Sequence, residues 1–311
     1  MKVALAGDTM LGRKVAEAIG EHGPDAVVAD EVVAVAHEAD LLVLNLECCI
    51  SERGERWPDP RKPFFFRAPP AATEVLTRLG VDCVTLANNH VLDYGAEALL
   101  DTLAHLRAAG IRCVGAGVDV AAARAPATLQ ADGFRVAVLG CADHPREYAA
   151  GPATPGIAYG LDWVGRALRD VEADAVVVTP HWGPNMTAEP MPRIRRAAAG
   201  LRAAGATLVA GHSAHVFHGV EDGILYDLGD FLDDYAVDRE LRNDLGLFFL
   251  VELDRVGPLR LEAVPLALDF CHTRLAADDE AEWIRDRFTA ACRRLGTEVR
   301  AEEGRLVASL R

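Results

Sequence analysis

Residues 1–13 read Met-Lys-Val-Ala-Leu-Ala-Gly-Asp-Thr-Met-Leu-Gly-Arg, and this opening stretch sets the pattern for the rest of the chain. An apolar run from Val3 to Ala6 ends in a glycine and an acid, and a helical pattern from Lys14 to Gly20 follows. A run of this kind is typical of a strand buried on both faces. It is too short for the apolar region of a signal peptide. The stretch therefore predicts a first strand followed by a helix.

The same alternation continues through most of the chain. Further buried strands are predicted at Leu41 to Leu44, Cys83 to Leu86, Val136 to Cys141, Ala175 to Thr179, Leu208 to Ala210 and Ile224 to Leu228. Helical patterns lie between them at Ala71 to Leu79, Ala96 to Ala109, Leu161 to Glu172 and Arg193 to Ala204. Strands that alternate with helices indicate βαβ units and a mostly parallel sheet. The sequence therefore predicts an α/β protein.

The rhythm changes after residue 245. Two strands follow each other at 247–253 and 259–268, and a helix at 278–295 and a strand near 305–310 come next. No linker rich in proline, glycine or serine separates this tail from the rest. We therefore expect a single domain over residues 1–311, with a motif-bearing α/β core at 1–245 and a tail at 246–311 that completes a second sheet.

Composition narrows the possible partners. The chain has 311 residues and a net charge of -15, which argues against nucleic acid because phosphate binding needs a basic surface. The seven cysteines show no regular spacing, so reduced thiols and a cytoplasmic location are expected. No apolar run approaches the length of about 20 residues that a membrane helix needs, so no membrane anchor is expected. The oligomeric state stays open.

Metal-ligand side chains follow the predicted strands. Six strand ends carry them, at Asp8, Asn45 to Glu47, Asn88 to His90, His181, His212 to His215, and Asp227 to Asp230. Because the carboxyl ends of parallel strands meet at one edge of a sheet, these polar groups would crowd together there. One or two divalent ions would satisfy them, with Mn, Fe or Zn favoured over Ca or Mg by the mixture of oxygen and imidazole ligands. The expected ligands are Asp8, Glu47, Asn89, His181, His212 and His215.

These motifs resemble one family in their order along the chain. They read Gly-Asp-Thr-Met-Leu-Gly-Arg at 7–13, Asn-Leu-Glu at 45–47, Leu-Ala-Asn-Asn-His at 86–90, Asp-Tyr-Gly at 93–95, His-Trp-Gly at 181–183, Gly-His-Ser-Ala-His-Val at 211–216 and Tyr-Asp-Leu-Gly-Asp-Phe at 226–231. Together they resemble the CapA family of poly-γ-glutamate capsule synthesis proteins, within the calcineurin-like metallophosphoesterase superfamily. The resemblance implies a four-layer α/β/β/α sandwich with one or two metals at the sheet edge.

The resemblance also implies a role for single residues. Asp8 resembles the metal ligand of the first strand, and Glu47 stands where the superfamily has a metal-bridging Asp. Asn89 resembles the ligand Asn, and His90 resembles the His that protonates the leaving group. The remaining ligands correspond to His181, His212 and His215.

Two positions depart from the superfamily pattern. Met10 stands where a ligand His is usual, and the last motif is Gly-His-x-x-His rather than Gly-His-x-His. A single tight metal, or a second weak one, is therefore an open alternative.

Three functions remain open at this stage. The first is a metal-dependent hydrolase of a phosphoester or of a peptide or γ-glutamyl bond, with His90 as general acid. The second is a metal-dependent peptide epimerase, with His90, His215, Cys48 or Asp230 as the base. The third is a non-catalytic component of poly-γ-glutamate synthesis or export.

The expected partner is a small-molecule or peptide substrate. Arg67, Trp182 and Cys48 are expected to contact it. Arg61 and Lys62 lie near Arg67, around the three phenylalanines 64–66, and this basic segment would suit an acidic substrate as a lid over the site.

Overall fold

The first strand lies in the middle of a ten-stranded sheet. The computed structural model describes residues 1–310. The strands of this sheet are β1 (Lys2–Thr9), β2 (Leu41–Leu46), β5 (Cys83–Thr85), β6 (Arg112–Val114), β15 (Asp230–Leu232), β16 (Leu245–Leu253), β17 (Pro258–Asp269), β18 (His272–Leu275), β19 (Val299–Glu302) and β20 (Arg305–Ser309). Their order is β19-β20-β17-β16-β1-β2-β5-β6, with β15 beside the end of β1 and β18 beside β17. β1, β2, β5 and β6 run parallel, whereas β16 is antiparallel to β1.

A second sheet comes from the middle of the chain. It contains β8 (Ala127–Ala131), β9 (Phe134–Ala142), β11 (Ala175–His181), β12 (Leu208–Ala210), β13 (Val220–Glu221) and β14 (Ile224–Leu225). The order is β13-β14-β12-β11-β9-β8, and the four strands β9, β11, β12 and β14 are parallel. Two small sheets pair β3 (Cys49–Ile50) with β4 (Arg67–Ala68) and β7 (Ala116–Gly117) with β10 (Gly156–Ile157).

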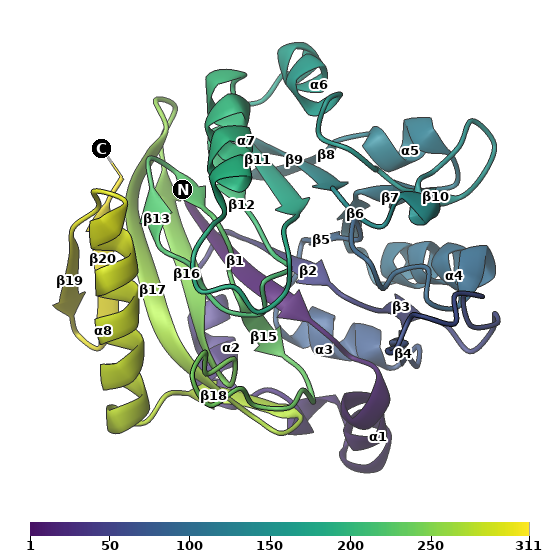
Figure 1. Cartoon of the computed structure of the whole chain (residues 1–311), viewed down its shortest axis with the longest axis horizontal. Helices are drawn as coiled ribbons and strands as arrows, with labels where there is room; N and C mark the ends of the chain where they lie inside the picture. Colours follow the sequence, from purple (N-terminus) through teal and green to yellow (C-terminus); the bar gives the residue numbers. More distant parts are fainter. Residues whose placement is uncertain (311) are drawn as a thin grey trace.

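Helices cover the outer faces of both sheets (Figure 1). They are α1 (Arg13–His22), α2 (Asp30–Ala36), α3 (Ala72–Arg78), α4 (Gly95–Ala108), α5 (Val120–Arg124), α6 (Val164–Asp170), α7 (Pro192–Ala203) and α8 (Asp278–Arg294), with 3-10 turns at Pro24–Ala26 and Arg146–Tyr148. α1 to α4 pack on the first sheet, and α5 to α7 pack on the second. α8 packs against β16 and β17 at the end of the sandwich.

The alternation of side chains along the strands shows the layers. In β1, Ala4 belongs to the core beneath α1 to α4, whereas Val3 and Leu5 belong to the core between the two sheets. In β11, Val177 faces the core between the sheets and Val178 faces α6 and α7. Because successive residues of a strand point to opposite faces, three apolar cores separate four layers. The expected α/β/β/α sandwich is confirmed.

The expectation for the tail was wrong in one respect. Residues 246–311 do not complete the second sheet: β16 pairs with β1, and β17 to β20 extend the first sheet from there. The physical reason lies in β16, where Phe249 faces the core between the sheets and Phe248 faces the core beneath the helices. A strand that is apolar on both faces needs a central position, and the free edge of β1 provides one.

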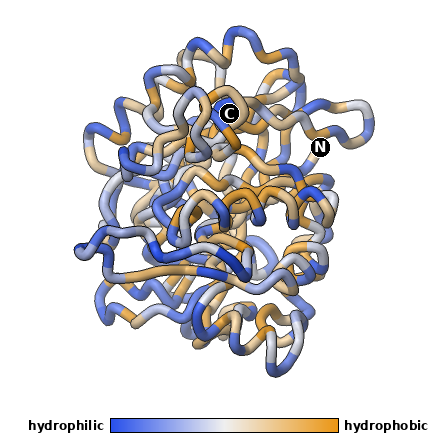
Figure 2. The backbone as a smooth tube through the Cα atoms, turned by 90° about the vertical axis from the view of Figure 1, so that its right-hand side faces the viewer, coloured by the Kyte–Doolittle hydropathy of each residue, from blue (hydrophilic) through white to orange (hydrophobic). Residues whose placement is uncertain are grey.

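Hydrophilic segments lie mostly at the surface of the sandwich and apolar segments mostly inside it. Many of the most hydrophilic stretches of the trace lie on peripheral loops, with apolar stretches on the inner strands (Figure 2). No helix among residues 1–310 has the length and apolar character needed to cross a bilayer.

Gly7 allows a close backbone approach beside the first predicted metal ligand. A Cβ atom at Gly7 would lie 1.8 Å from the carbonyl oxygen of Gly229. The Asp8 amide donates a hydrogen bond to that same carbonyl at 2.9 Å. The glycine therefore lets the 229–230 segment lie directly against the end of β1, which brings Asp230 next to Asp8.

Candidate metal centre

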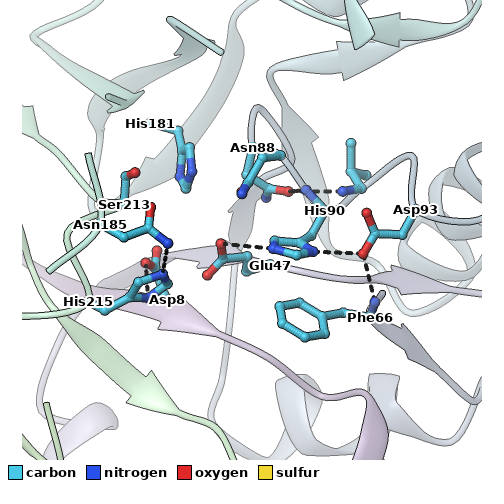
Figure 3. Close-up of polar contacts among 12 residues, drawn as sticks. Asp8, Glu47, Phe66, Asn88, His90, Asp93, His181, Asn185, Ser213 and His215 are labelled. Atoms are coloured by element: carbon cyan, nitrogen blue, oxygen red, sulfur yellow. Dashed lines mark hydrogen bonds and ion pairs between the residues drawn. The ribbon is translucent and has the colours of Figure 1, made fainter. Parts of the chain in front are cut away.

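Strands of both sheets end at one edge of the sandwich. Asp8 lies near the end of β1, and Glu47 comes directly after β2. His181 is the last residue of β11 and forms a single parallel bridge with His212, which lies just beyond β12. Figure 3 shows side chains from the two sheets facing each other across this edge. The predicted strand-end residues therefore meet in space.

One cluster consists of Asp8, His181 and His212, whose candidate ligand atoms lie within 4.8 Å of one another. The two Nδ1 atoms of the histidines are 2.7 Å apart, and His212 Nδ1 is 3.7 Å from Asp8 Oδ1. Burial lowers the pKa of His181 and lowers that of His212 to about 3, and neighbouring imidazoles add to both shifts. Both rings are therefore neutral at pH 7, which is the state in which imidazole binds metal ions.

A second cluster shares Asp8 and adds His215 and Asp230. His215 Nδ1 lies 2.8 Å from Asp230 Oδ1 and 3.3 Å from Asp8 Oδ2. Burial disfavours the charged ring, but the carboxylates of Glu47 and Asp8 outweigh it and raise the pKa of His215. The backbone of His215 has φ +61°, an uncommon conformation for a residue with a side chain, and this turn points the ring back toward β1.

Several buried polar atoms at this edge have no hydrogen-bond partner among residues 1–310. They are Asp8 Oδ2, both Glu47 carboxylate oxygens, Asn89 Oδ1, His181 Nε2 and Asp230 Oδ2. Burial and the nearby Asp8 raise the pKa of Glu47, because two negative charges crowd a site with little solvent. Such groups are costly to bury unless a cation or a donor satisfies them. Their oxygen and imidazole chemistry fits a divalent metal ion.

Buried amides hold Asp8 in place. Asn88 Nδ2 donates to Asn45 Oδ1 at 3.0 Å, and Asn45 Nδ2 donates to Asp8 Oδ1 at 2.6 Å. Asp227, which the sequence placed among the strand ends without a role, accepts the backbone amides of Ala214 and Gly229 at 2.8 and 2.9 Å. These hydrogen bonds fix the orientation of Asp8 and of the loop that carries His212 and His215. Sequence reasoning assigned no role to Asn45 or Asn88, although both lie within the motifs that it singled out.

His90 projects toward the same edge from the loop after β5 (Figure 3). Its Nδ1 is 2.7 Å from Asp93 Oδ2, and its Nε2 is 4.0 Å from Glu47 Oε1. The ring stacks on Phe66, with centroids 3.9 Å apart. Asp93 also accepts the Phe66 amide at 2.7 Å and pairs with Lys62 at 2.9 Å. The carboxylate thus fixes the orientation of His90, a role that sequence reasoning did not assign to Asp93.

Two of the expected substrate contacts are ruled out by burial. Cys48 is 0% exposed, and burial raises the pKa of its thiol, so it can neither touch a substrate nor act as the base of an epimerase. Trp182 is 2% exposed and donates from Nε1 to the Tyr226 carbonyl at 3.0 Å. Both side chains serve packing, because Cys48 belongs to the core beneath α1 to α4 and Trp182 to the core beneath α5 to α7.

The basic segment around residue 64 is only partly arranged as expected. Arg67 stacks on Tyr94 at 4.0 Å from the ring centroid and is not among the residues that line the pocket beside the clusters. Arg61 pairs with Asp59 at the surface, and Lys62 is engaged by Asp93. The structure does not bring Arg67 to the lining of this pocket, and its expected substrate contact stays a prediction.

Met10 lies away from the clusters, whereas Asp230 lies within one of them. Met10 is fully buried, and its sulfur accepts the Gly12 amide at 3.1 Å, so it faces the core rather than the clusters. Asp230, a candidate base, is buried at 1% exposure beside His215. Burial, and then the neighbouring Asp233, raise the pKa of Asp230. Its position suits a ligand or an orienting group better than a group that meets substrate.

A pocket of about 450 Å³ opens beside the clusters. His90 and His215 both line it, together with the aromatic side chains of Phe64, Phe66 and Tyr235. A volume of this size falls within the range of small-molecule sites.

Several bacterial proteins are similar in sequence to most of this chain. A probable polyglutamine synthesis accessory protein of Mycobacterium tuberculosis is 33% identical over 284 residues, covering 84% of this chain and 74% of the relative. The PGA biosynthesis protein CapA of Bacillus subtilis is 27% identical, covering 86% of this chain and 71% of the relative. The capsule biosynthesis protein CapA of Bacillus anthracis is 29% identical, covering 86% and 67%.

Solved structures share the fold at low sequence identity. A novel phosphatase from Mycoplasma pneumoniae aligns with a TM-score of 0.53 and 12% identity, covering 86% of this chain and 93% of that one. A hypothetical protein from Thermus thermophilus aligns with a TM-score of 0.51 and 16% identity, covering 85% and 98%. These two proteins therefore share the fold of this chain.

The resemblance to CapA proteins is thereby confirmed. Residues 2–235 match the family described as bacterial capsule synthesis protein PGA_cap. Both clusters, the supporting amides and the His90–Asp93 pair lie inside that span, and the tail after it extends the same sheet. The chain therefore belongs to the bacterial capsule synthesis protein PGA_cap family.

Proposed function

We propose that this protein is a metal-dependent hydrolase that acts on a phosphoester or on a peptide or γ-glutamyl bond. The observation that supports the proposal is the arrangement of two clusters that share Asp8, next to a pocket that His90 also lines. Asp8, His181 and His212 would hold one ion, and Asp8, His215 and Asp230 would hold a second. The unsatisfied oxygens of Glu47 and Asn89 would complete the set. When bound, divalent ions supply Lewis acidity that activates water and screens charge on the substrate.

His90 would supply the proton for the leaving group. With Nδ1 directed at Asp93, the ring presents Nε2 to the site. Burial lowers the pKa of His90 to about 4, and Asp93 works against this shift because its negative charge favours the protonated ring. An anionic substrate near Nε2 would favour the protonated ring further. The stacked Phe66 ring keeps the imidazole in this orientation.

A peptide epimerase is the second candidate. His90 and His215 both line the pocket, so two imidazoles could remove and return an α-proton. The other two candidate bases are less suitable, because Cys48 and Asp230 are buried. A non-catalytic role in poly-γ-glutamate synthesis or export is the third candidate, and the description of the Mycobacterium tuberculosis relative as an accessory protein favours it.

The decisive experiment combines metal content with activity. Protein purified without chelators would be compared with Asp8→Asn, His212→Ala and, as a control, His22→Ala, whose side chain is exposed. We expect near-stoichiometric Mn, Fe or Zn in the wild type and in His22→Ala, with loss in the two site variants while the melting profile stays cooperative.

Activity assays then separate the three candidates. Release of phosphate or amine from model esters and peptides, abolished in both site variants, supports the hydrolase. Solvent deuterium at an α-carbon without bond cleavage supports the epimerase. Metal binding with neither reaction supports the accessory role, and absence of metal even after adding these ions in excess contradicts all metal-dependent chemistry here.

A further inference from the structure

The pocket beside the clusters contains a single arginine or lysine side chain, that of Arg13, among the residues that line it. Arg13 is the first residue of α1 and directly follows the Gly-Asp-Thr-Met-Leu-Gly stretch that carries Asp8. Its side chain remains 35% exposed, although its partner Asp234 is completely buried. The guanidinium is therefore held by a buried carboxylate and is accessible from the pocket.

Asp234 holds Arg13 in place through one hydrogen bond and one further ion-pair contact. Nε donates to Asp234 Oδ2 at 3.1 Å, and Nη2 lies 3.0 Å from Asp234 Oδ1. Asp234 Oδ2 also accepts the backbone amide of Lys14 at 3.0 Å, so the carboxylate is fixed to the start of α1. The Arg13 backbone has φ +51°, which residues with side chains adopt rarely and which surrounding contacts must hold in place. The pairing with Asp234 uses Nε and one N–H of Nη2, so both N–H groups of Nη1 and the second N–H of Nη2 remain as a fork of donors.

Aromatic rings surround the guanidinium. The Arg13 guanidinium carbon lies 5.6 Å from the Phe64 ring centroid, 5.4 Å from that of Phe66 and 6.0 Å from that of Tyr235. Stacking of this kind fixes the plane of the fork and limits its hydration. Because the rings already hold one cation, the same place does not suit a cationic substrate group. A planar, pre-oriented guanidinium instead suits carboxylate or phosphate oxygens.

We propose that Arg13 binds a second anionic group of the substrate, a carboxylate or a phosphate, in this pocket. The reacting bond would lie at the His90 and His215 side, where the clusters are, and the apolar part of the substrate would lie along Phe64 and Phe66. This assignment rests on the proposed function for the location of the reacting bond. The binding of the anion to Arg13 can be measured without any reaction.

The test pairs a change in the ligand with a change in the residue. Protein loaded with Mn²⁺ would be titrated by calorimetry with succinate, glutarate and adipate, each compared with its own monoamide. Each pair differs only in whether the far end carries a carboxylate or an uncharged amide. The proteins would be the wild type, Arg13→Lys, and Arg56→Lys as a control, because Arg56 also stacks on a phenylalanine (5.1 Å from the Phe65 centroid) but does not line the pocket.

At the best-fitting chain length we expect the second carboxylate to tighten binding at least 10-fold in the wild type and in Arg56→Lys, because a fork of donors engages it. In Arg13→Lys we expect this gain to shrink to less than threefold, since lysine keeps the charge and can still pair with Asp234 but lacks the fork. A parallel titration replaces the far carboxylate by a phosphonate. Whichever of the two probes binds more tightly shows whether Arg13 prefers a carboxylate or a phosphate group.

Two results would overturn the assignment: an equal gain in Arg13→Lys and the wild type, or no gain in the wild type at any chain length. Manganese content and the melting temperature of Arg13→Lys show whether the site and fold persist. Failure of the proposed function would give a different result. The protein would bind metal, and its binding of diacids would depend on Arg13, but it would hydrolyse none of the esters or peptides tested.

Discussion

Replacing Asp93 by asparagine would test the proton-transfer role of His90. The carboxylate accepts from His90 Nδ1 at 2.7 Å, from the Phe66 amide at 2.7 Å and from the Tyr148 hydroxyl at 3.2 Å, and it pairs with Lys62 at 2.9 Å. Asparagine keeps the shape and one acceptor oxygen, so the Phe66 amide stays satisfied. The change removes the negative charge that favours the protonated imidazole.

The expected size of the effect follows from the charge that is lost, because Asp93 Oδ2 accepts from both the Phe66 amide and His90 Nδ1 and asparagine keeps one oxygen there without the charge. Hydrogen bonds to charged groups contribute about 1.5–3 kcal/mol. If the Asp93 carboxylate stabilises the imidazolium by that amount in the transition state, its loss lowers kcat by about 10- to 100-fold. The loss should depend on the leaving group, because a nitrophenolate departs without a proton whereas a phenolate or alkoxide requires one.

The assay would measure kcat for a nitrophenyl ester and for the matching phenyl ester, with metal content determined on every sample. Asp101→Asn is the matched control, since Asp101 also accepts from a hydroxyl and an arginine but lies on α4, away from the residues that line the pocket. We expect Asp93→Asn to slow the phenyl ester at least 10-fold more than the nitrophenyl ester. An equal decrease for both esters at full metal content would refute the reasoning, because a purely structural loss would not distinguish leaving groups.

Three further outcomes are expected. Burial lowers the pKa of His218 to about 4, so as the pH falls from 6.5 to 4 the unfolded chain binds a proton that the folded chain does not, and the contribution of His218 to the free energy of unfolding falls by about 2 kcal/mol from pH 7 to 5. Urea titrations should therefore show a fall that is smaller by about this amount in His218→Gln, and an unchanged fall would contradict the assignment. Gly7→Ala should lower the free energy of unfolding by more than about 3 kcal/mol, because its Cβ would lie 1.8 Å from a backbone oxygen. The control Gly20→Ala, in an open helical position, should raise the free energy of unfolding by about 0.5–1 kcal/mol. A small loss of stability in Gly7→Ala would show that the two backbone segments can move apart. Asn45→Ala removes the 2.6 Å hydrogen bond to Asp8 and should weaken metal affinity about 10- to 100-fold in chelator competition, and unchanged affinity would show that Asp8 needs no such support.

The buried strands were predictable because their signal is local. β1, β2 and β11 are continuous apolar runs, and both faces of each strand are buried. α2 was not predicted, because its sequence Asp-Glu-Val-Val-Ala-Val-Ala has the valine content of a strand and becomes helical with two acids in its first turn. The pairing of β16 with β1 could not be predicted either. A strand that is apolar on both faces is expected to be central, but its sequence does not indicate beside which strand it lies.

The candidate ligands were predictable because they occupy strand ends, whose position in an α/β sheet follows from topology. Asp8, His181 and His212 meet on that basis alone. The orientation of side chains in the connecting loops depends on tertiary contacts that the sequence does not reveal. For this reason Cys48 and Trp182 were expected at the substrate and are buried, while Arg13 lines the pocket although its motif gave no sign of that role.

The pairing of β1 with β16 has a consequence for biosynthesis. During translation β1 emerges before β2 and pairs with it soon afterwards, but on its other edge residues 2–5 have no partner until residues 249–252 have left the ribosome. An apolar strand with a free edge is prone to pair with other chains. We therefore expect the nascent protein to depend on chaperones until the central sheet closes, and to fold slowly because strands so far apart in the chain must find each other.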